Sequence, residues 1–227
     1  MRANEFIVEY KEIDEGWKDV AVGSALALGA LGGAYAKLQP TTPAPQQQVV
    51  QKQVQFTPIS NNPQNEIQLL KTAKANGLKG AELAQFMAQT KHESWDFNRL
   101  KEKPQPGVKG YFNKKYDIKH APKTAKILGN KKVGDGERYH GRGFIQLTGR
   151  DNYRMAGEAL GLDLLNNPDL AAKPEIASKI ALWYWNSRVK PHVENFNDTK
   201  AVTRKINPAG KGLEDRQSNF KDYLRMV

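Results

Sequence analysis

The stretch YHGRGFIQLTGRDNY, from Tyr139 to Tyr153, concentrates glycines, polar groups and aromatic side chains within fifteen residues. Glycine lets the backbone turn, or approach a ligand, where a Cβ atom would clash. Neutral amides and hydroxyls supply donors and acceptors that suit sugar hydroxyl groups. The glycines are Gly141, Gly143 and Gly149, and the neutral polar side chains are Gln146, Thr148 and Asn152. The spacing is typical of a ligand-facing surface, and equally of a glycine-rich hairpin whose polar groups bond one another.

Two further blocks frame this stretch. Upstream stands AQTKHES (88–94), and downstream stand VTRKIN (202–207), Gly212 and the pair Asp215-Arg216. Together with Tyr-x-Gly-Arg-Gly, Gln-Leu-Thr and Asn-Tyr in the central stretch, they resemble glycoside hydrolase family 19, the chitinases and chitinase-like phage endolysins. The order and spacing are similar to the phage branch, and the resemblance covers roughly residues 65 to 227.

The upstream block places a carboxyl group at a helix end. Residues 80–94 read as a helix in which Leu83, Phe86, Met87 and Thr90 form one apolar stripe. At about 100° per residue, Glu93 falls on the margin of that stripe and His92 on the opposite side. A carboxyl group beside packed apolar surface keeps its proton more readily, as a general acid must. The resemblance implies that Glu93 is the catalytic acid, whereas a lone Glu at a helix end is more often a solvated surface group.

Hydrolysis of a glycosidic bond usually needs a second carboxyl group. We assign it to Glu102, nine residues after Glu93, the spacing of the endolysin branch, at the start of a loop rich in proline and glycine. Glu137 is the rival. Family 19 enzymes invert, so the resemblance implies that Glu102 activates a water held by Thr148. An inverting pair stands roughly 6.5 to 9.5 Å apart.

The resemblance also implies a set of sugar contacts. By motif position these are His92, Tyr139, Arg142, Gln146, Asn152, Asn207 and Arg216. Tyr139 is a candidate stacking surface, as is Trp183, which suits the core equally well. Arg216 also suits a bidentate contact with a catalytic carboxylate, or an ion pair that holds the C-terminal helix. The family's Asn-Gly-Gly here reads Asn207-Pro208-Ala209-Gly210, which stiffens the backbone beside Asn207.

Helical periodicity dominates the second half of the chain. It recurs over residues 66–76, 81–92, 152–160, 174–186, 198–206 and 213–226. The glycine-rich stretch supplies at most a small sheet. We therefore predict an α+β, mainly helical, lysozyme-like domain over residues 65–227, with a cleft between two helical lobes. Residues 40–64 have the Pro- and Gln-rich composition of a linker, and residues 1–39 form a separate N-terminal segment.

Charge is unevenly distributed along the chain. Residues 1–64 carry five Lys or Arg and six Asp or Glu, a balance of −1, so the remaining residues carry 30 minus 18, or +12. A basic domain is drawn to a polyanion, and bacterial cell walls are rich in carboxylates and phosphates. Nucleic acid would also suit this charge, but no nucleic-acid motif is present, so we do not expect it as the partner. The chain has no cysteine, and its four histidines make no metal-ligand spacing, so we expect no metal and no cofactor.

The N-terminal segment contains an uncharged stretch rich in Ala, Gly and Leu at residues 20–36. Its seventeen residues approach the length of a membrane crossing. The nineteen residues before it carry six acidic and three basic side chains, the reverse of a signal peptide. Membrane contact through residues 20–36 and burial of a small-residue helix in an assembly, such as a phage particle, both remain open.

These observations predict a lytic glycoside hydrolase, made in a host cytoplasm, that cleaves β-1,4 links between amino sugars of bacterial peptidoglycan. It would act from the periplasm or the outer face, either as a free phage endolysin or as a hydrolase that is carried in a virion or anchored to a membrane before release. We expect the catalytic domain to act as a monomer. Chitin is the alternative substrate. A non-catalytic wall-binding or virion structural protein is the alternative of another class.

Overall fold

Residues 56–227 are described by the computed structural model, and the whole of segment 1–39 and the linker up to residue 55 lie outside them. The helices are α1 (Pro63–Ala75), α2 (Gly80–Glu93), α3 (Tyr111–Tyr116), α4 (Pro122–Leu128), α5 (Asp135–Arg138), α6 (Arg150–Leu160), α7 (Pro174–Tyr184), α8 (Thr199–Ile206) and α9 (Leu213–Leu224). The short turns are η3 (Pro168–Ala172) and η5 (Lys190–His192), both 3₁₀, and the π-helical η4 (Trp185–Val189). Over these residues no helix is both long and apolar enough to cross a membrane.

The domain begins just before α1. The side chain of Asn62 accepts a hydrogen bond from the amide of Asn65 at 3.2 Å, and Pro63 takes the first helical position, where no amide hydrogen is needed. The buried carboxylate of Glu66 accepts the amides of Ile59 and Ser60 at 3.1 and 2.9 Å. Residues 59–62 therefore pack onto the domain, and α1 begins two residues before the boundary that we placed at 65.

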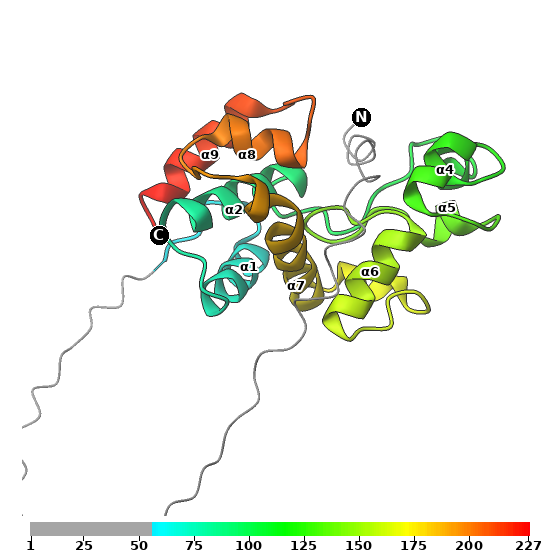
Figure 1. Cartoon of the computed structure of the whole chain (residues 1–227), viewed down its shortest axis with the longest axis horizontal. Coiled ribbons are helices and arrows are strands. Elements are labelled where there is room, and N and C mark those ends of the chain that lie inside the picture. The colour runs from blue at the N-terminus through cyan, green and yellow to red at the C-terminus, as the bar shows by residue number, and fades with distance from the viewer. Residues whose placement is uncertain (1–55) are drawn as a thin grey trace, which may run out of the picture. The chain divides into compact units, whose positions relative to one another are not determined.

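One group of helices comprises α1, α2, α7, α8 and α9 (Figure 1). The main packing in it is of α2 along α9 and of α1 along α7. The apolar stripe predicted on α2 is buried, with Leu83, Phe86 and Met87 each at most 1 % exposed. Because apolar residues recur at helical spacing, these helices match the sequence prediction to within a few residues at most ends.

A second group comprises α3, α4 and α5, and α4 also contacts α6 (Figure 1). Phe112, Tyr116 and Leu128 form its apolar cluster. The sequence analysis did not predict these three helices. Each has seven residues or fewer, and α3 and α5 begin after glycines in the left-handed conformation, Gly110 and Gly134. Short helices surrounded by lysine and glycine carry little periodic signal.

The glycine-rich stretch lies between the two groups and forms turns rather than a sheet. Within the described residues its only strand-like pairing is two isolated bridges, Lys101 with Arg142 and Arg142 with Leu147. The small β segment that we predicted is reduced to these bridges. The mainly helical fold is confirmed.

The chain leaves α2 by an unusual turn. Trp95, Asp96 and Phe97 have φ angles of 54°, 60° and 60°, so three consecutive non-glycine residues are left-handed. Such a residue costs roughly 1 to 2 kcal/mol, because its Cβ approaches the following carbonyl oxygen. Packing of Phe97, which is fully buried and meets Phe144 edge to face at 5.9 Å, holds the turn in place.

Candidate active site

Glu93, the last residue of α2, lies beneath α9 and is 8 % exposed. Its Oε1 accepts a hydrogen bond from Nη2 of Arg216 on α9. Arg216 is 1 % exposed, and its Nη1 also donates to Oε1 of Gln89 at 2.5 Å. A buried carboxylate is stable in a protein only when it is paired and hydrogen-bonded. Arg216 thus fixes the orientation of Glu93 and links α2 to α9.

A chain of buried polar groups continues from Gln89 into α8. The amide nitrogen of Gln89 donates to the hydroxyl of Thr203 at 3.1 Å. One turn earlier, Gln85 donates to the hydroxyl of Thr199 at 2.8 Å. All four side chains are at most 5 % exposed. Because buried polar groups must keep their partners, this chain fixes α8 and α9 against the end of α2.

His92 lies in the same interface and not on an open surface opposite the stripe. Its side chain is 9 % exposed, and Nδ1 lies 2.5 Å from Oδ2 of Asp215. A Cβ on Gly212 would come within 2.2 Å of the His92 ring, so α9 begins directly against it. Burial, and then the charge of Arg216, lower the pKa of His92, although Asp215 partly opposes them. His92 therefore packs as a neutral ring between α2 and α9.

Glu102, the second predicted carboxylate, has a different set of partners. Its Oε1 accepts Nζ of Lys115 at 2.8 Å and the hydroxyl of Tyr116 at 3.0 Å, both from α3. Its Oε2 lies 3.1 Å from the amide nitrogen of Gly141. Burial, followed by the charge of Glu102, raises the pKa of Tyr116, so the phenol remains a donor. Lys115 and Tyr116 were not among the predicted site residues, because α3 was not predicted from the sequence.

The segment between the two carboxylates runs along the glycine-rich stretch. The carbonyl of Arg99 accepts Nε2 of Gln146 at 3.2 Å, and the carbonyl of Leu100 accepts the amide of Gly143 at 2.9 Å. The amide of Glu102 donates to the carbonyl of Gly141 at 2.8 Å. Glu93 and Glu102 therefore stand at the two ends of one segment that is bound to the predicted ligand-facing stretch.

Glu137, the rival carboxylate, lies on α5 with an exposed side chain. Its backbone amide donates to Asn113, and its carbonyl accepts Nδ1 of His140 at 2.6 Å. Glu102 rather than Glu137 contacts the glycine-rich stretch through its carboxylate.

Three of the predicted polar residues line the end of the glycine-rich stretch. Gln146 has a φ of 53° and donates to the carbonyls of Arg99 and Gly143. Thr148 is 6 % exposed and donates to the carbonyl of Gln146 at 2.8 Å. Asn152 is half-buried and donates to the carbonyl of Thr148 at 2.7 Å. A Cβ on Gly141 would meet Gln146 at 2.9 Å and Glu102 at 3.1 Å, which brings these two side chains to one point.

Two predicted sugar contacts have structural positions instead. Tyr139 is 2 % exposed and donates its hydroxyl to the carbonyl of Leu165, so its ring offers no face to a sugar. Arg142 is 3 % exposed and is bound to Asp169 at 2.9 Å and to the hydroxyl of Tyr153 at 2.9 Å. Both residues hold the glycine-rich stretch together. Part of the density of polar groups in this stretch therefore reflects bonding within the domain.

Asn207 and Trp183 lie at the ends of helices. Asn207 follows α8 and is 7 % exposed. Its backbone N–H donates to the carbonyl of Thr203 at 2.6 Å. Trp183 is half-buried near the end of α7, next to residues of the core.

Trp95 is a surface aromatic that the sequence analysis did not select. It follows Glu93 by two residues, is 47 % exposed and stacks on the guanidinium of Arg99, which lies 3.9 Å from the ring centroid. An exposed tryptophan beside a candidate acid is a natural surface for a sugar ring. The sequence offered one sign of this role, which is that a tryptophan directly follows the His-Glu-Ser motif.

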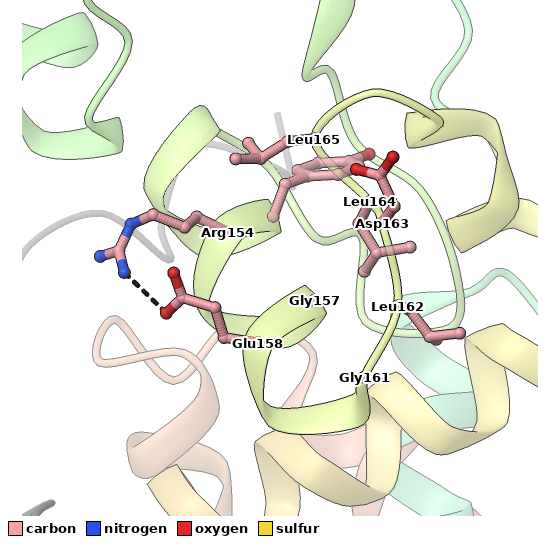
Figure 2. Close-up of a pocket in the computed structure, with 9 residues that line it drawn as sticks. Arg154, Gly157, Glu158, Gly161, Leu162, Asp163, Leu164 and Leu165 are labelled. Carbon is pink, nitrogen blue, oxygen red and sulfur yellow. Dashed lines mark hydrogen bonds and ion pairs between the residues drawn. The ribbon is translucent and has the colours of Figure 1, made fainter.

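An open hollow of about 320 Å³ lies elsewhere, between α6 and the loop that follows it. Figure 2 shows Arg154 and Glu158 paired across one turn of α6, with Leu162 to Leu165 on the opposite wall. None of the predicted site residues lines this hollow. We take the region around Glu93 and Glu102, where the predicted carboxylates lie, as the candidate active site.

Known proteins match this chain, and the family match is placed on numbered residues. Residues 63–213 match the family described as chitinase class I, glycoside hydrolase family 19. A glycosyl hydrolase family 19 domain-containing protein of Haemophilus influenzae is 33 % identical over 169 residues, which are 66 % of this chain and 82 % of the relative. The basic endochitinase of Vitis vinifera is 34 % identical over 143 residues, 57 % of this chain and 40 % of the relative.

Plant relatives are longer proteins. An endochitinase of Arabidopsis thaliana is 42 % identical over 93 residues, 39 % of this chain and 32 % of the relative, so the match spans about a third of its length. Among solved structures, chitinase C of Streptomyces griseus HUT6037 superposes with a TM-score of 0.53 at 26 % identity. That match covers 72 % of this chain and 82 % of chitinase C. The chain therefore belongs to glycoside hydrolase family 19, a family of glycosidases that includes the chitinases.

Proposed function

We propose that this protein is an inverting glycosidase that cleaves β-1,4 links between amino sugars of bacterial peptidoglycan. The observation that carries the proposal is the pair of carboxylates, Glu93 and Glu102, each nearly buried and each held by its own cation. Two oriented carboxyl groups, one on each side of the scissile bond, are what glycoside hydrolysis requires.

In this proposal Glu93 is the general acid. Glu93 rests as a carboxylate whose Oε1 is paired with Arg216. Its Oε2 forms no hydrogen bond to the described residues, so Oε2 is the oxygen that would take up a proton before each turnover and pass it to the leaving group. When that proton is transferred, Glu93 becomes negative. The fixed charge of Arg216 then stabilises it without reorganisation, which favours the transfer.

Glu102 is the general base. Lys115 donates to Oε1, the Tyr116 hydroxyl is shared between Oε1 and Oε2 at 3.0 and 3.2 Å, and the Gly141 amide donates to Oε2 at 3.1 Å. A carboxylate has about four lone-pair sites, so these three donors leave capacity for a hydrogen of water. The hydroxyl of Thr148 donates to a protein carbonyl, so its lone pairs are available to accept the other hydrogen. We therefore propose that Glu102 activates the water and that Thr148 supports it as the second acceptor.

Peptidoglycan is proposed as the substrate because residues 65–227 carry a net charge of +12 and bacterial walls are polyanionic. Chitin is the second candidate, favoured by the relatives, which are chitinases of plants and of Streptomyces griseus. The two polymers share β-1,4-linked N-acetylated amino sugars. On this proposal the enzyme is made in a host cytoplasm and acts on the cell wall, as a phage endolysin or as a particle-borne hydrolase.

The test is release of reducing ends from purified peptidoglycan and, separately, from chitin oligomers. Glu93→Gln and Glu102→Gln each keep the shape of the side chain and remove the proton-transfer group. Each should lower the rate about a hundredfold or more. Glu137→Gln is the matched control and should leave the rate unchanged.

Three outcomes would contradict parts of the proposal. If Glu137→Gln lowered the rate of hydrolysis as much as Glu102→Gln, the assignment of Glu102 as the general base would be wrong. If proton NMR of freshly released product showed retention of the anomeric configuration, an inverting mechanism would be excluded. No release from either polymer, together with sedimentation of the protein with cell walls, would indicate a non-catalytic binding module.

A further inference from the structure

The surface of α4 and of the loops at its two ends differs from the rest of the described domain. Between Ile118 and Val133 the chain carries five lysines and no acidic residue. These lysines are Lys119, Lys123, Lys126, Lys131 and Lys132, and all are exposed. The exposed side chains from residue 118 to residue 133 are referred to below as the α4 surface.

Most of these lysines have no carboxylate of the described residues within ion-pair distance. Lys131 lies 3.8 Å from Asp151, a weak contact at the border of the surface. Within residues 56–227, the other four form no ion pair.

The same surface also exposes apolar side chains. Residues 56–227 contain six exposed large hydrophobic residues, and three of them fall within these sixteen positions. They are Ile118 at 41 %, Ile127 at 48 % and Val133 at 72 % exposed. Exposed hydrophobic residues scattered singly need no explanation, but a concentration of them indicates an interaction site.

The fold brings the two loops together. The amide of Gly134 donates to Oδ2 of the buried Asp117 at 2.6 Å, so the segments that carry Ile118 and Val133 meet at this hydrogen bond. On α4 the side chains of Ala125 and Leu128 point into the core. At about 100° per residue, Lys123, Lys126 and Ile127 therefore share the outward face. Figure 1 shows α4 and α5 at one end of the described domain, away from α1, α8 and α9.

We propose that the α4 surface binds the surface of a bilayer that contains anionic phospholipid. Lysines at such a surface are attracted to the phosphates of the headgroups, while apolar side chains enter the boundary between headgroups and acyl chains. Lysine stems can lie along that boundary with their ammonium groups in water. A soluble polyanion would satisfy the lysines but would offer nothing to the apolar trio, which is why a bilayer fits better. This inference is independent of the glycosidase proposed above.

The experiment is sedimentation of the full chain with vesicles of phosphatidylcholine, with and without phosphatidylglycerol. The triple variant Lys123→Gln, Lys126→Gln, Lys132→Gln should lower binding to the anionic vesicles about a hundredfold, because each lysine near such a surface contributes about fivefold. The variant Ile118→Ser, Ile127→Ser, Val133→Ser should lower it at least tenfold and abolish the binding that survives high salt. All six positions are exposed, so both variants should fold.

The matched control is Lys71→Gln, Lys74→Gln, Lys79→Gln, which removes the same charge from exposed positions on α1 and the loop after it. It should bind as the unchanged protein does. Hydrolysis of soluble chitin oligomers, if present, should be the same in all variants, which separates this proposal from the proposed catalytic function.

Several results would overturn the proposal. Unchanged binding of the apolar variant, or complete displacement by inorganic polyphosphate, would indicate a purely electrostatic surface for a soluble polyanion. Vesicle binding that neither variant reduces would place the contact elsewhere in the chain, with residues 20–36 the first candidate. No preference of the unchanged protein for anionic vesicles would reject the surface altogether.

Discussion

Nδ1 of His92 lies 2.5 Å from Oδ2 of Asp215, and the next residue on each helix forms the next pair, Glu93 with Arg216. Two consecutive residues of α2 are thus bound to two consecutive residues of α9. Helices that contact each other at one position can rotate about it, but two adjacent pairs fix both distance and rotation. The candidate acid is held where α2 and α9 are most firmly joined.

Removal of Arg216 should destabilise the domain strongly. Arg216→Met leaves Glu93 buried without a cation, and an uncompensated buried charge costs about 3 to 5 kcal/mol. Adding Glu93→Gln should recover part of the loss, because the charge is then gone. Denaturant unfolding measures both variants. Arg225→Met, which breaks the exposed pair with Asp222, is the control and should change stability by less than about 0.5 kcal/mol. A loss with Arg216→Met as small as this would show that the pair is solvated.

Stability should fall on mild acidification because of two histidines. Burial is the main cause that lowers the pKa of His92 and also that of His140, whose ring stacks on Phe112 at 4.2 Å. Each folded pKa lies below the unfolded value of about 6.5. The unfolded chain therefore takes up protons first, so stability is complete above about pH 6.5 and is lost as pH falls toward the folded values.

Thermal unfolding between pH 8 and pH 5 tests this expectation. His92→Asn and His140→Asn keep a side-chain donor and should flatten the decline, whereas the same change at exposed His120 should leave it in place. If the variant that carries both His92→Asn and His140→Asn lost thermal stability with falling pH as steeply as the unchanged protein, other groups would be responsible for the acid sensitivity.

A methyl group on Gly141 should impair catalysis more than folding. In Gly141→Ala the new Cβ would lie 2.9 Å from Oε1 of Gln146 and 3.1 Å from Oε2 of Glu102, so both side chains must move. A displacement of a catalytic group by about 1 Å can cost a hundredfold in rate. We expect kcat to fall by about that factor on the substrate that the enzyme accepts. Gly107→Ala is the control: the new Cβ meets no neighbouring atom, and the φ of +77° costs backbone strain in an exposed loop without displacing Gln146 or Glu102. A kcat loss of the same size there would contradict this account.

Trp95 should contribute to substrate binding rather than to the chemical step. Because its exposed ring lies two residues beyond Glu93, Trp95→Ala should raise KM on oligomers roughly five- to tenfold with little change in kcat. Steady-state kinetics on oligomers of increasing length measures the effect. Leu224→Ala, at another exposed apolar side chain, should leave KM unchanged. An unchanged KM for Trp95→Ala would show that the ring serves the turn and not the sugar.

The long helices were predictable because burial of one face imposes a repeat on the sequence. On α2 the stripe of Leu83, Phe86 and Met87 sufficed. On α3 no such repeat exists, and for that reason the partners of Glu102 that it carries, Lys115 and Tyr116, were missed. Their role depends on contacts across thirteen and fourteen residues, which no local pattern records.

The polar residues of the glycine-rich stretch were predictable as a group but not one by one. Arg142, Tyr139 and Gln146 have the same composition signal, and all three donate to partners within the domain. These partners are Asp169, the carbonyl of Leu165 and the carbonyls of Arg99 and Gly143. A sequence shows that a polar side chain needs a partner, and only the fold shows whether that partner is protein. The left-handed turn at Trp95 carried no signal either, since glycine is the residue expected at such a backbone.

The carboxylate of Glu66 accepts the amides of Ile59 and Ser60 and, at 2.7 Å, the hydroxyl of Tyr223. The first and last parts of the described domain are thus joined at one buried atom group, and Figure 1 shows the C-terminus beside the start of the coloured ribbon. The two ends of the described domain therefore lie close enough to be joined by a short linker. A circular permutant that joins residue 227 to residue 56 through a short linker, and opens the exposed loop at Gly107, should therefore retain the fold, because the order of the elements in the gene is separable from their arrangement in space.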